Sequence, residues 1–137
     1  GLGDVYKRQS CYSLKYHLVV VTKYRHKVIN KAILNSLIEI SKNIFEEKWG
    51  CEIIEINGEQ DHLHLLFEAP PQVQLSSLIN NYKTVSSRLI RKAYKEEIEK
   101  YYWKPYFWSR SYLLLSSGGA QIEVIKQYIK EQDSPKE

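Results

Sequence analysis

The chain has 137 residues, of which 43% are hydrophobic and 26% charged, with a formal net charge of +4. This composition excludes a disordered chain and is typical of one folded domain, and its modest positive charge suits an anionic partner such as nucleic acid. No apolar run approaches the ~18 to 20 residues of a membrane-spanning helix. The two cysteines, Cys11 and Cys51, form neither a disulfide framework nor a zinc ribbon, so we expect a cytoplasmic protein.

The first residues of the chain resemble a translated cloning sequence. The chain contains no methionine, and the segment Asp4-Val5-Tyr6-Lys7-Arg8-Gln9 is similar to the end of a common sequencing-library adaptor. We therefore expect residues 1–9 to be a disordered sequencing or cloning artefact. Residues 10–137 are then expected to form a single domain.

The hydrophobic pattern of the first half predicts a strand, a helix and a hairpin. Alternation over 12–22 predicts a strand, and Val19-Val20-Val21 makes its centre buried on both faces. Asn30 is a suitable N-cap for a helix that ends near Trp49, before Gly50. Two further strands, over 51–57 and 63–68, are predicted to form a hairpin around Gly58.

The second half predicts two more helices and a strand. A long amphipathic helix begins near Leu75 and reaches at least Tyr94, with these residues facing inward: Leu75, Leu78, Ile79, Tyr82, Val85, Leu89 and Ile90. An aromatic stretch over 101–108 leads into a strand that ends near Leu115, and a flexible joint over 116–119 precedes a helix over 120–132. The resulting order predicts an α+β, ferredoxin-like β-α-β-β-α-β fold, with an antiparallel sheet, helices on one face and a C-terminal helix that carries Tyr128.

Two histidines on the third predicted strand are the chief chemical signal. His62 and His64 are two positions apart, so their side chains share one face of the strand, whereas Leu63 faces the helix-covered side. Two imidazoles at this spacing can bind one divalent ion, although ordinary strand histidines fit the same pattern. His17 neighbours the pair if it shares their face, and Asp61 is interpreted as a turn residue or a support for a ligand.

A tyrosine and a glutamine one turn apart on the last helix are the second signal. Tyr128 and Gln132 are four positions apart and so share one face. A tyrosine hydroxyl, with a pKa of ~10, becomes a useful nucleophile at a phosphorus centre polarised by a metal. A glutamine carbonyl suits Mg²⁺ or Mn²⁺. The alternative is that Tyr128 simply packs beside Ile125 and Ile129.

Basic and aromatic residues form a third, more permissive signal. Cations in the first loop and on the long helix can follow a phosphate backbone: Lys23, Arg25, Lys83, Arg88, Arg91 and Lys92. The aromatic stretch over 101–108 can stack on unpaired bases. A solvated helix face and a set of core aromatic residues explain the same pattern.

These features together resemble a known family. The residues that carry the resemblance are those over 61–67, the Gly118-Gly119-Ala120 joint, and the segment 124–129 followed by Gln132, with further matches over 16–25 and 108–112. They are similar to the single-tyrosine transposases of the histidine-hydrophobic-histidine endonuclease superfamily. More narrowly, they resemble the small IS200-like and REP-associated tyrosine transposases, whose elements move as single-stranded DNA. The resemblance spans residues 12–132.

The resemblance implies a mechanism and a set of roles. His62, His64 and Gln132 would bind a divalent metal, Mg²⁺ or Mn²⁺, and Tyr128 would attack a phosphate of single-stranded DNA to form a 5′-phosphotyrosine. The protein would recognise subterminal hairpins at insertion-sequence ends. It would act as a homodimer whose active sites are completed in trans, with Gly118 and Gly119 as the hinge. A prokaryotic, nucleoid-associated location is implied as well. Gln121 departs from the family pattern, in which a proline is common.

Two alternatives stay open. One is a non-catalytic nucleic-acid-binding module that uses a ferredoxin-like sheet and stacked aromatic residues. The other, within the same family, is a domesticated enzyme that acts on repetitive chromosomal palindromes.

Overall fold

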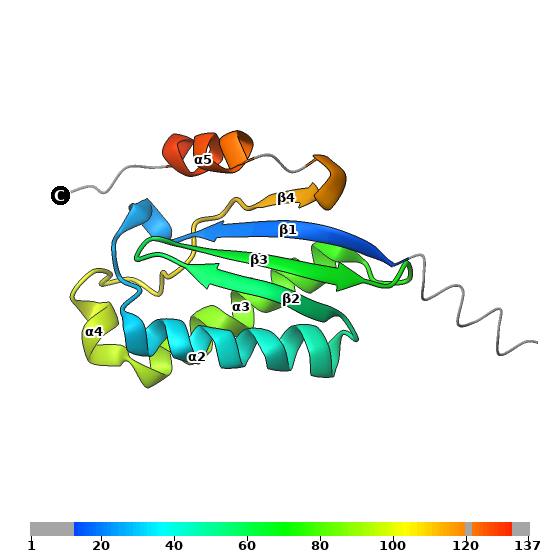
Figure 1. Ribbon diagram of the computed structural model, residues 1–137. Helices are drawn as coiled ribbons and strands as arrows, with labels where there is room; N and C mark the ends of the chain where they lie inside the picture. The colour runs from blue at the N-terminus through cyan, green and yellow to red at the C-terminus, as the bar shows by residue number, and fades with distance from the viewer. Residues whose placement is uncertain (1–12, 120–121, 133–137) are drawn as a thin grey trace, which may run out of the picture.

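The computed structural model describes residues 13–119 and 122–132, so the expected artefact over residues 1–9 lies outside the described residues. Figure 1 shows its helices and strands in chain order. They are β1 (Leu14–Val21), α2 (Lys31–Lys42), β2 (Glu52–Gly58), β3 (His62–Ala69), α3 (Leu75–Ala93), α4 (Lys95–Glu99), β4 (Leu113–Ser116) and α5 (Ile122–Glu131).

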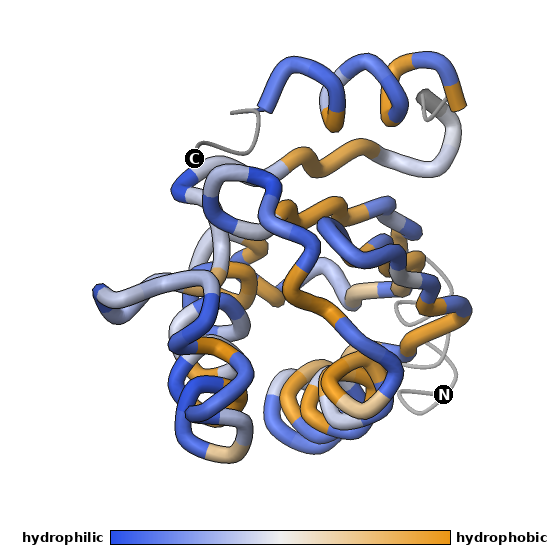
Figure 2. The backbone as a smooth tube through the Cα atoms, turned by 90° about the vertical axis from the view of Figure 1, so that its left-hand side faces the viewer, coloured by the Kyte–Doolittle hydropathy of each residue, from blue (hydrophilic) through white to orange (hydrophobic). Residues whose placement is uncertain are grey.

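The strands form one four-stranded sheet in the order β2-β3-β1-β4, and every neighbouring pair is antiparallel. The predicted α+β class, the antiparallel sheet and the C-terminal helix are confirmed. Helices α2 and α3 pack on one side of the sheet, whereas α5 lies along β4 on the other side (Figures 1 and 2). This arrangement leaves α5 separate from the main helix layer.

The first helix begins and ends as its sequence predicts. The side chain of Asn30 accepts a hydrogen bond from the backbone N–H of Ile33 at 2.8 Å, which caps α2. The helical path continues beyond α2 through a π-helical turn, Asn43–Lys48, that the sequence pattern does not indicate. Gly50 follows with a φ of 68°, a left-handed conformation that favours glycine and stops the helix.

The core lies between the sheet and the helices α2 and α3. Leu18, Leu63 and Leu65 are fully buried there. Val19 and Val21 point to the opposite side of β1 and are also fully buried, so the centre of the strand is covered on both faces, as predicted. Figure 2 shows the hydrophobic stretches along the strands, between α5 and the other helices.

Three details differ from the sequence-based expectations. Leu89 was expected to face inward, but it is 39% exposed because it lies at the edge of the apolar stripe of α3. A short helix, α4, follows α3, and the aromatic stretch then takes an extended path, in which Trp108 bridges Thr22, before β4 begins. The strand β3 starts at His62, one residue earlier than expected.

Among the described residues, no helix is long and apolar enough to cross a membrane.

Candidate active site

The strand β3 places its two histidines on the face away from α2 and α3. Burial alternates along β3, so Leu63 and Leu65 are buried in the core while His62 and His64 are only half-buried. The antiparallel register pairs Val21 with His62 and Val19 with His64. The two imidazoles therefore lie beside the centre of β1, on the face that also carries α5.

A carboxylate and a guanidinium orient His62. Its Nδ1 lies 2.9 Å from Oδ1 of Asp61, and Oδ2 of Asp61 lies 3.4 Å from Nε of Arg25. A carboxylate only accepts hydrogen bonds, so Nδ1 of His62 carries a proton, and in the neutral ring Nε2 is the nitrogen with the lone pair. Tyr24 and Arg25 both have positive φ, 59° and 56°, a strained backbone that brings Arg25 to this position.

His64 pairs with a third histidine. Its Nε2 lies 2.8 Å from Nδ1 of His17 on β1, so His17 does share the face of the pair. Burial lowers the pKa of His64 below its ordinary value, and the neighbouring His17 lowers it further, while Glu55 opposes both. His64 is therefore neutral near pH 7, which is the form that binds a metal.

Tyr128 on α5 and Gln132, the residue that follows α5, meet at one serine. The hydroxyl of Ser111 donates to Oε1 of Gln132 at 2.8 Å and accepts from the Tyr128 hydroxyl at 2.8 Å. Nε2 of Gln132 also donates to the carbonyl of Tyr128 at 3.3 Å. Burial raises the pKa of Tyr128 above its ordinary value, and the hydrogen bond with Ser111 partly offsets that shift.

The strand register shows how the histidines of β3 lie relative to Ser111 and its partners. The backbone N–H of Ser109 donates to the carbonyl of Val21 at 2.7 Å, and Val21 pairs with His62. Within the sheet, β1 therefore lies between Ser111 and His62, which are about two strand spacings or ~10 Å apart. The structure brings His17, His62 and His64 together in one group. It brings Ser111, Tyr128 and Gln132 together in another, along the same sheet.

Four of the six predicted DNA-binding cations make contacts within the chain, among them Arg91, whose Nε donates to Oγ of Ser87 at 3.2 Å. Nζ of Lys23 lies over the rings of Tyr24 and Tyr106, at 5.2 and 5.1 Å from their centroids. Arg25 pairs with Asp61, as described above. Nζ of Lys83 donates to the carbonyls of Arg110 and Ser111, at 2.7 and 3.3 Å. Lys83 thus ties α3 to the segment that contacts Tyr128.

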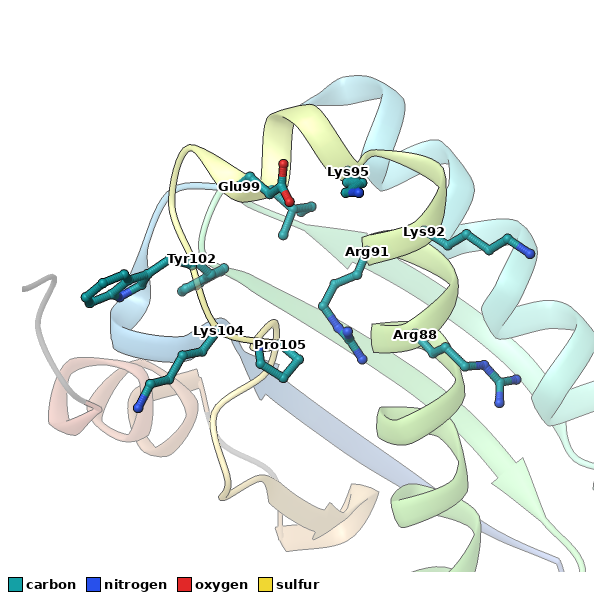
Figure 3. Close-up of a pocket in the computed structure, with 10 residues that line it drawn as sticks. Arg88, Arg91, Lys92, Lys95, Glu99, Tyr102, Lys104 and Pro105 are labelled. Atoms are coloured by element: carbon teal, nitrogen blue, oxygen red, sulfur yellow. The ribbon is translucent and has the colours of Figure 1, made fainter.

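Arg91 and the two remaining cations, Arg88 and Lys92, line a cavity at the C-terminal half of α3. Figure 3 shows Arg91 directed toward the loop that follows α4, whereas Arg88 and Lys92 extend to the other side of the helix. No acidic partner holds them in an ion pair among the contacts of the described residues.

The predicted hinge lies in a tight turn between β4 and α5, Ser117–Gly119. A Cβ atom added at Gly118 would meet no other atom within 4 Å. Neither packing nor a positive φ therefore requires glycine at this position.

Sequence analysis did not identify Ser111 or the Arg25–Asp61 pair as parts of the site. Ser111 lies in a segment that matches the family pattern, but nothing in its spacing indicates that it contacts α5. Among the described residues, no three His, Cys, Asp or Glu side chains are close enough to share a metal ion.

The chain matches a protein family and is similar to several known proteins. The family model for transposases of the IS200-like type matches residues 10–132. The chain is 33% identical over 121 residues to the ISDra2 transposase TnpA of Deinococcus radiodurans, across 88% of this chain and 85% of that protein. It is 30% identical over 121 residues to the transposase for insertion sequence element IS200 of Salmonella typhimurium, across 88% and 78%.

Two solved structures are also similar. A crystal structure of a Deinococcus radiodurans R1 protein named as a transposase superposes with a TM-score of 0.81 and 29% identity, over 90% of this chain and 93% of that one. The REP-associated tyrosine transposase bound to a REP hairpin superposes with a TM-score of 0.56 and 11% identity, over 85% and 62%. The second likeness is one of fold alone.

Proposed function

Because this chain belongs to the family of IS200-like transposases, we propose that it cleaves and rejoins single-stranded DNA at insertion-sequence ends through Tyr128. The phenol oxygen of Tyr128 forms a bond to the scissile phosphorus while the bond to the 3′ oxygen breaks. The phenol proton is released to solvent, and the departing oxygen takes up a proton to become a 3′-hydroxyl. Strand transfer is the reverse, with a different 3′-hydroxyl attacking the 5′-phosphotyrosine.

The observation that carries the proposal is the placement of Tyr128. Its hydroxyl lies with the Gln132 amide at Ser111, on the same side of the sheet as the two histidines of β3. Nothing else in the described chain places a tyrosine hydroxyl and a glutamine amide together beside a histidine pair. Movement of α5 across β1 would bring all four side chains into one site.

His62, His64 and Gln132 are the residues that we propose to hold a divalent metal, Mg²⁺ or Mn²⁺. The hydrogen bond of His62 to Asp61 fixes the tautomer with a free Nε2, an arrangement typical of metal-binding histidines. His64 is neutral near pH 7, and the Gln132 carbonyl is an oxygen ligand that both ions accept. When bound, the ion would polarise the phosphate and stabilise the departing oxygen.

We further propose that residues 10–137 form a single transposase domain of ferredoxin-like type. The strand order β2-β3-β1-β4, with α2 and α3 as the connections, supports this classification. Subterminal DNA hairpins, with the unpaired strand beside them, are the proposed ligands of the predicted DNA-binding cations in the first loop and on α3. A homodimer would complete each active site in trans, with Gly118 and Gly119 as the hinge, and the protein would act at the prokaryotic nucleoid.

The direct test is a covalent-adduct assay. The protein is mixed with a labelled single strand from the DNA that flanks its gene, with Mg²⁺, with Mn²⁺ or with EDTA, and run on a denaturing gel. A metal-dependent shifted band is expected, because the phosphotyrosine survives denaturation. Tyr128→Phe should abolish the band and leave hairpin binding within a few-fold. Tyr112→Phe is the matched control, since it removes a neighbouring phenol, and it should keep the band.

The outcomes separate the alternatives. A band that persists in Tyr128→Phe would exclude Tyr128 as the nucleophile. Hairpin binding without any adduct, insensitive to EDTA and to His62→Ala, would favour the non-catalytic nucleic-acid-binding module. Adduct formation on dispersed chromosomal palindromes, and not on element ends, would favour the domesticated enzyme.

A further inference from the structure

A groove runs along α3 that the proposed chemistry does not use. One cavity of about 350 Å³ lies between the C-terminal half of α3, α4 and the loop that follows (Figure 3). A second of about 280 Å³ lies between the middle of α3 and residues 105–110. Arg91 and Pro105 line both cavities, so the two are adjacent along α3. We call this feature the α3 groove.

The α3 groove is strongly basic. Five cations line its first cavity, against the single carboxylate of Glu99 among the described residues: Arg88, Arg91, Lys92, Lys95 and Lys104. Figure 3 shows the Arg91 side chain reaching from α3 toward Pro105, across the groove. The cations repeat along α3, and the facing loop contributes Lys104, whose side chain points away from the helix. This arrangement suits a chain of phosphates better than a single anion.

An exposed tryptophan lies at the wide end of the α3 groove. Trp103 lines the first cavity and is 94% exposed, so its indole contributes almost nothing to the core. The neighbouring Tyr102 is buried and forms part of the wall. Proteins bind single-stranded nucleic acid with an exposed aromatic ring next to several cations, because the ring stacks on unpaired bases.

The other end of the α3 groove reaches the segment beside the candidate nucleophile. Ser109 and Arg110 line the second cavity, and the next residue, Ser111, bonds to Tyr128. Lys83 holds this segment to α3 through the carbonyls of Arg110 and Ser111. A strand that follows the groove from Trp103 would therefore leave it next to α5.

We propose that the α3 groove binds the unpaired DNA strand that flanks the hairpin and guides it toward Tyr128. Arg88, Arg91 and Lys104 contact successive phosphates, and Trp103 stacks on an unpaired base. The assignment rests on the proposed function, because it takes Tyr128 as the destination of the strand. It adds a site for the single strand that is separate from the histidine pair.

The test compares two fluorescent probes in EDTA, where no cleavage occurs. One is a blunt DNA hairpin, and the other is the same hairpin with a short oligo-dT tail. The tail should raise the affinity of the unmodified protein. Trp103→Ala should weaken binding of the tailed probe about tenfold and leave the blunt probe within twofold. Arg91→Gln should reduce the slope of log affinity against log salt for the tailed probe by about one. Lys31→Gln, an exposed cation on α2, is the control and should change neither.

The proposal that the α3 groove binds the strand would be overturned if Trp103→Ala and Arg91→Gln bound the tailed probe with the same affinity as the unmodified protein. An equal change in Lys31→Gln would show a bulk-charge effect and would also overturn it. The covalent-adduct assay separates this failure from failure of the proposed function. If the unmodified protein forms adduct but the groove variants bind the tailed probe normally, only the proposal for the α3 groove is rejected. If the unmodified protein forms no metal-dependent adduct, the proposed chemistry of Tyr128 is rejected, and the proposal for the groove loses its premise.

Discussion

Ser111 holds Tyr128 of α5 and Gln132, the residue that follows α5. Its hydroxyl donates to Oε1 of Gln132, so one lone pair of that oxygen is engaged. It also accepts a hydrogen bond from the Tyr128 hydroxyl, which holds the phenol at Ser111. The serine therefore stabilises a resting arrangement of α5, and movement of both side chains to the histidines would break both hydrogen bonds.

Ser111→Ala should release this resting arrangement. A neutral hydrogen bond contributes about 1 kcal/mol, so removing the bond to Gln132 should lower the Mn²⁺ concentration for half-maximal adduct formation about fivefold. Ser116→Ala, at the exposed far end of β4, is the matched control and should leave the metal titration unchanged. A higher metal requirement in Ser111→Ala would show instead that the serine helps to assemble the active site.

The pH dependence of cleavage follows from two side chains. Burial raises the pKa of Tyr128, so the reactive phenolate grows with every unit of pH up to and beyond pH 10. Burial and His17 lower the pKa of His64, so this side chain stays neutral to a lower pH than an ordinary histidine, and protonation competes with metal only in acidic solution. The rate of adduct formation in Mg²⁺ should therefore rise continuously from pH 7 to pH 9.5. A plateau that begins near pH 8 would contradict a directly attacking phenolate and require a general base.

At the level of the element, α5 is the least anchored helix of the fold. None of its residues, Ile122–Glu131, is buried, whereas α2 buries Ile33, Leu37 and Ser41. Only one side of α5, with Ile125, Tyr128 and Ile129, is partly covered. A helix held in this way can leave the sheet without disturbing the core, which is what transfer of Tyr128 to another site requires.

Amide hydrogen exchange should detect this difference. Peptides from α5 should exchange at least about tenfold faster than peptides from α2, because α5 opens locally while α2 opens only with the core. Binding of a tailed hairpin in the presence of Mn²⁺ should slow exchange in α5 selectively. Equal protection of α5 and α2 in the free protein would contradict a mobile nucleophile helix.

The helices and strands were more predictable from sequence than the contacts between them. Alternation located β1 and β3, and Asn30 and Gly50 marked the limits of the first helical segment, because these signals depend on neighbours in the chain. Contacts between distant segments left no such signal. The bond between His17 and His64 depends on the register of β1 with β3, and the bond between Ser111 and Tyr128 depends on how α5 folds back. The candidate site was therefore found as separate residues, and its internal contacts were not.

For the whole molecule, the open question with the largest consequence is whether one chain can complete the site alone. Tyr128 is docked on its own subunit, across β1 from His62, so the resting contact lies within one chain. The outer side of α5 nevertheless exposes Ile122 and Val124, 66% and 41% accessible. Apolar side chains on the outside of a weakly held helix favour a second protein surface against that side.

Mixing two inactive variants decides between the arrangements. His64→Ala lacks a metal ligand and Tyr128→Phe lacks the nucleophile, so neither forms adduct alone. If each site takes its tyrosine helix from the partner, random mixing makes about half of the dimers mixed, and each mixed dimer has one intact site of two. About a quarter of the normal adduct should then return, all of it on the His64→Ala chain. A mixture that forms mixed dimers but no adduct would place Tyr128 and His64 of one chain in the same site, with α5 crossing only its own β1.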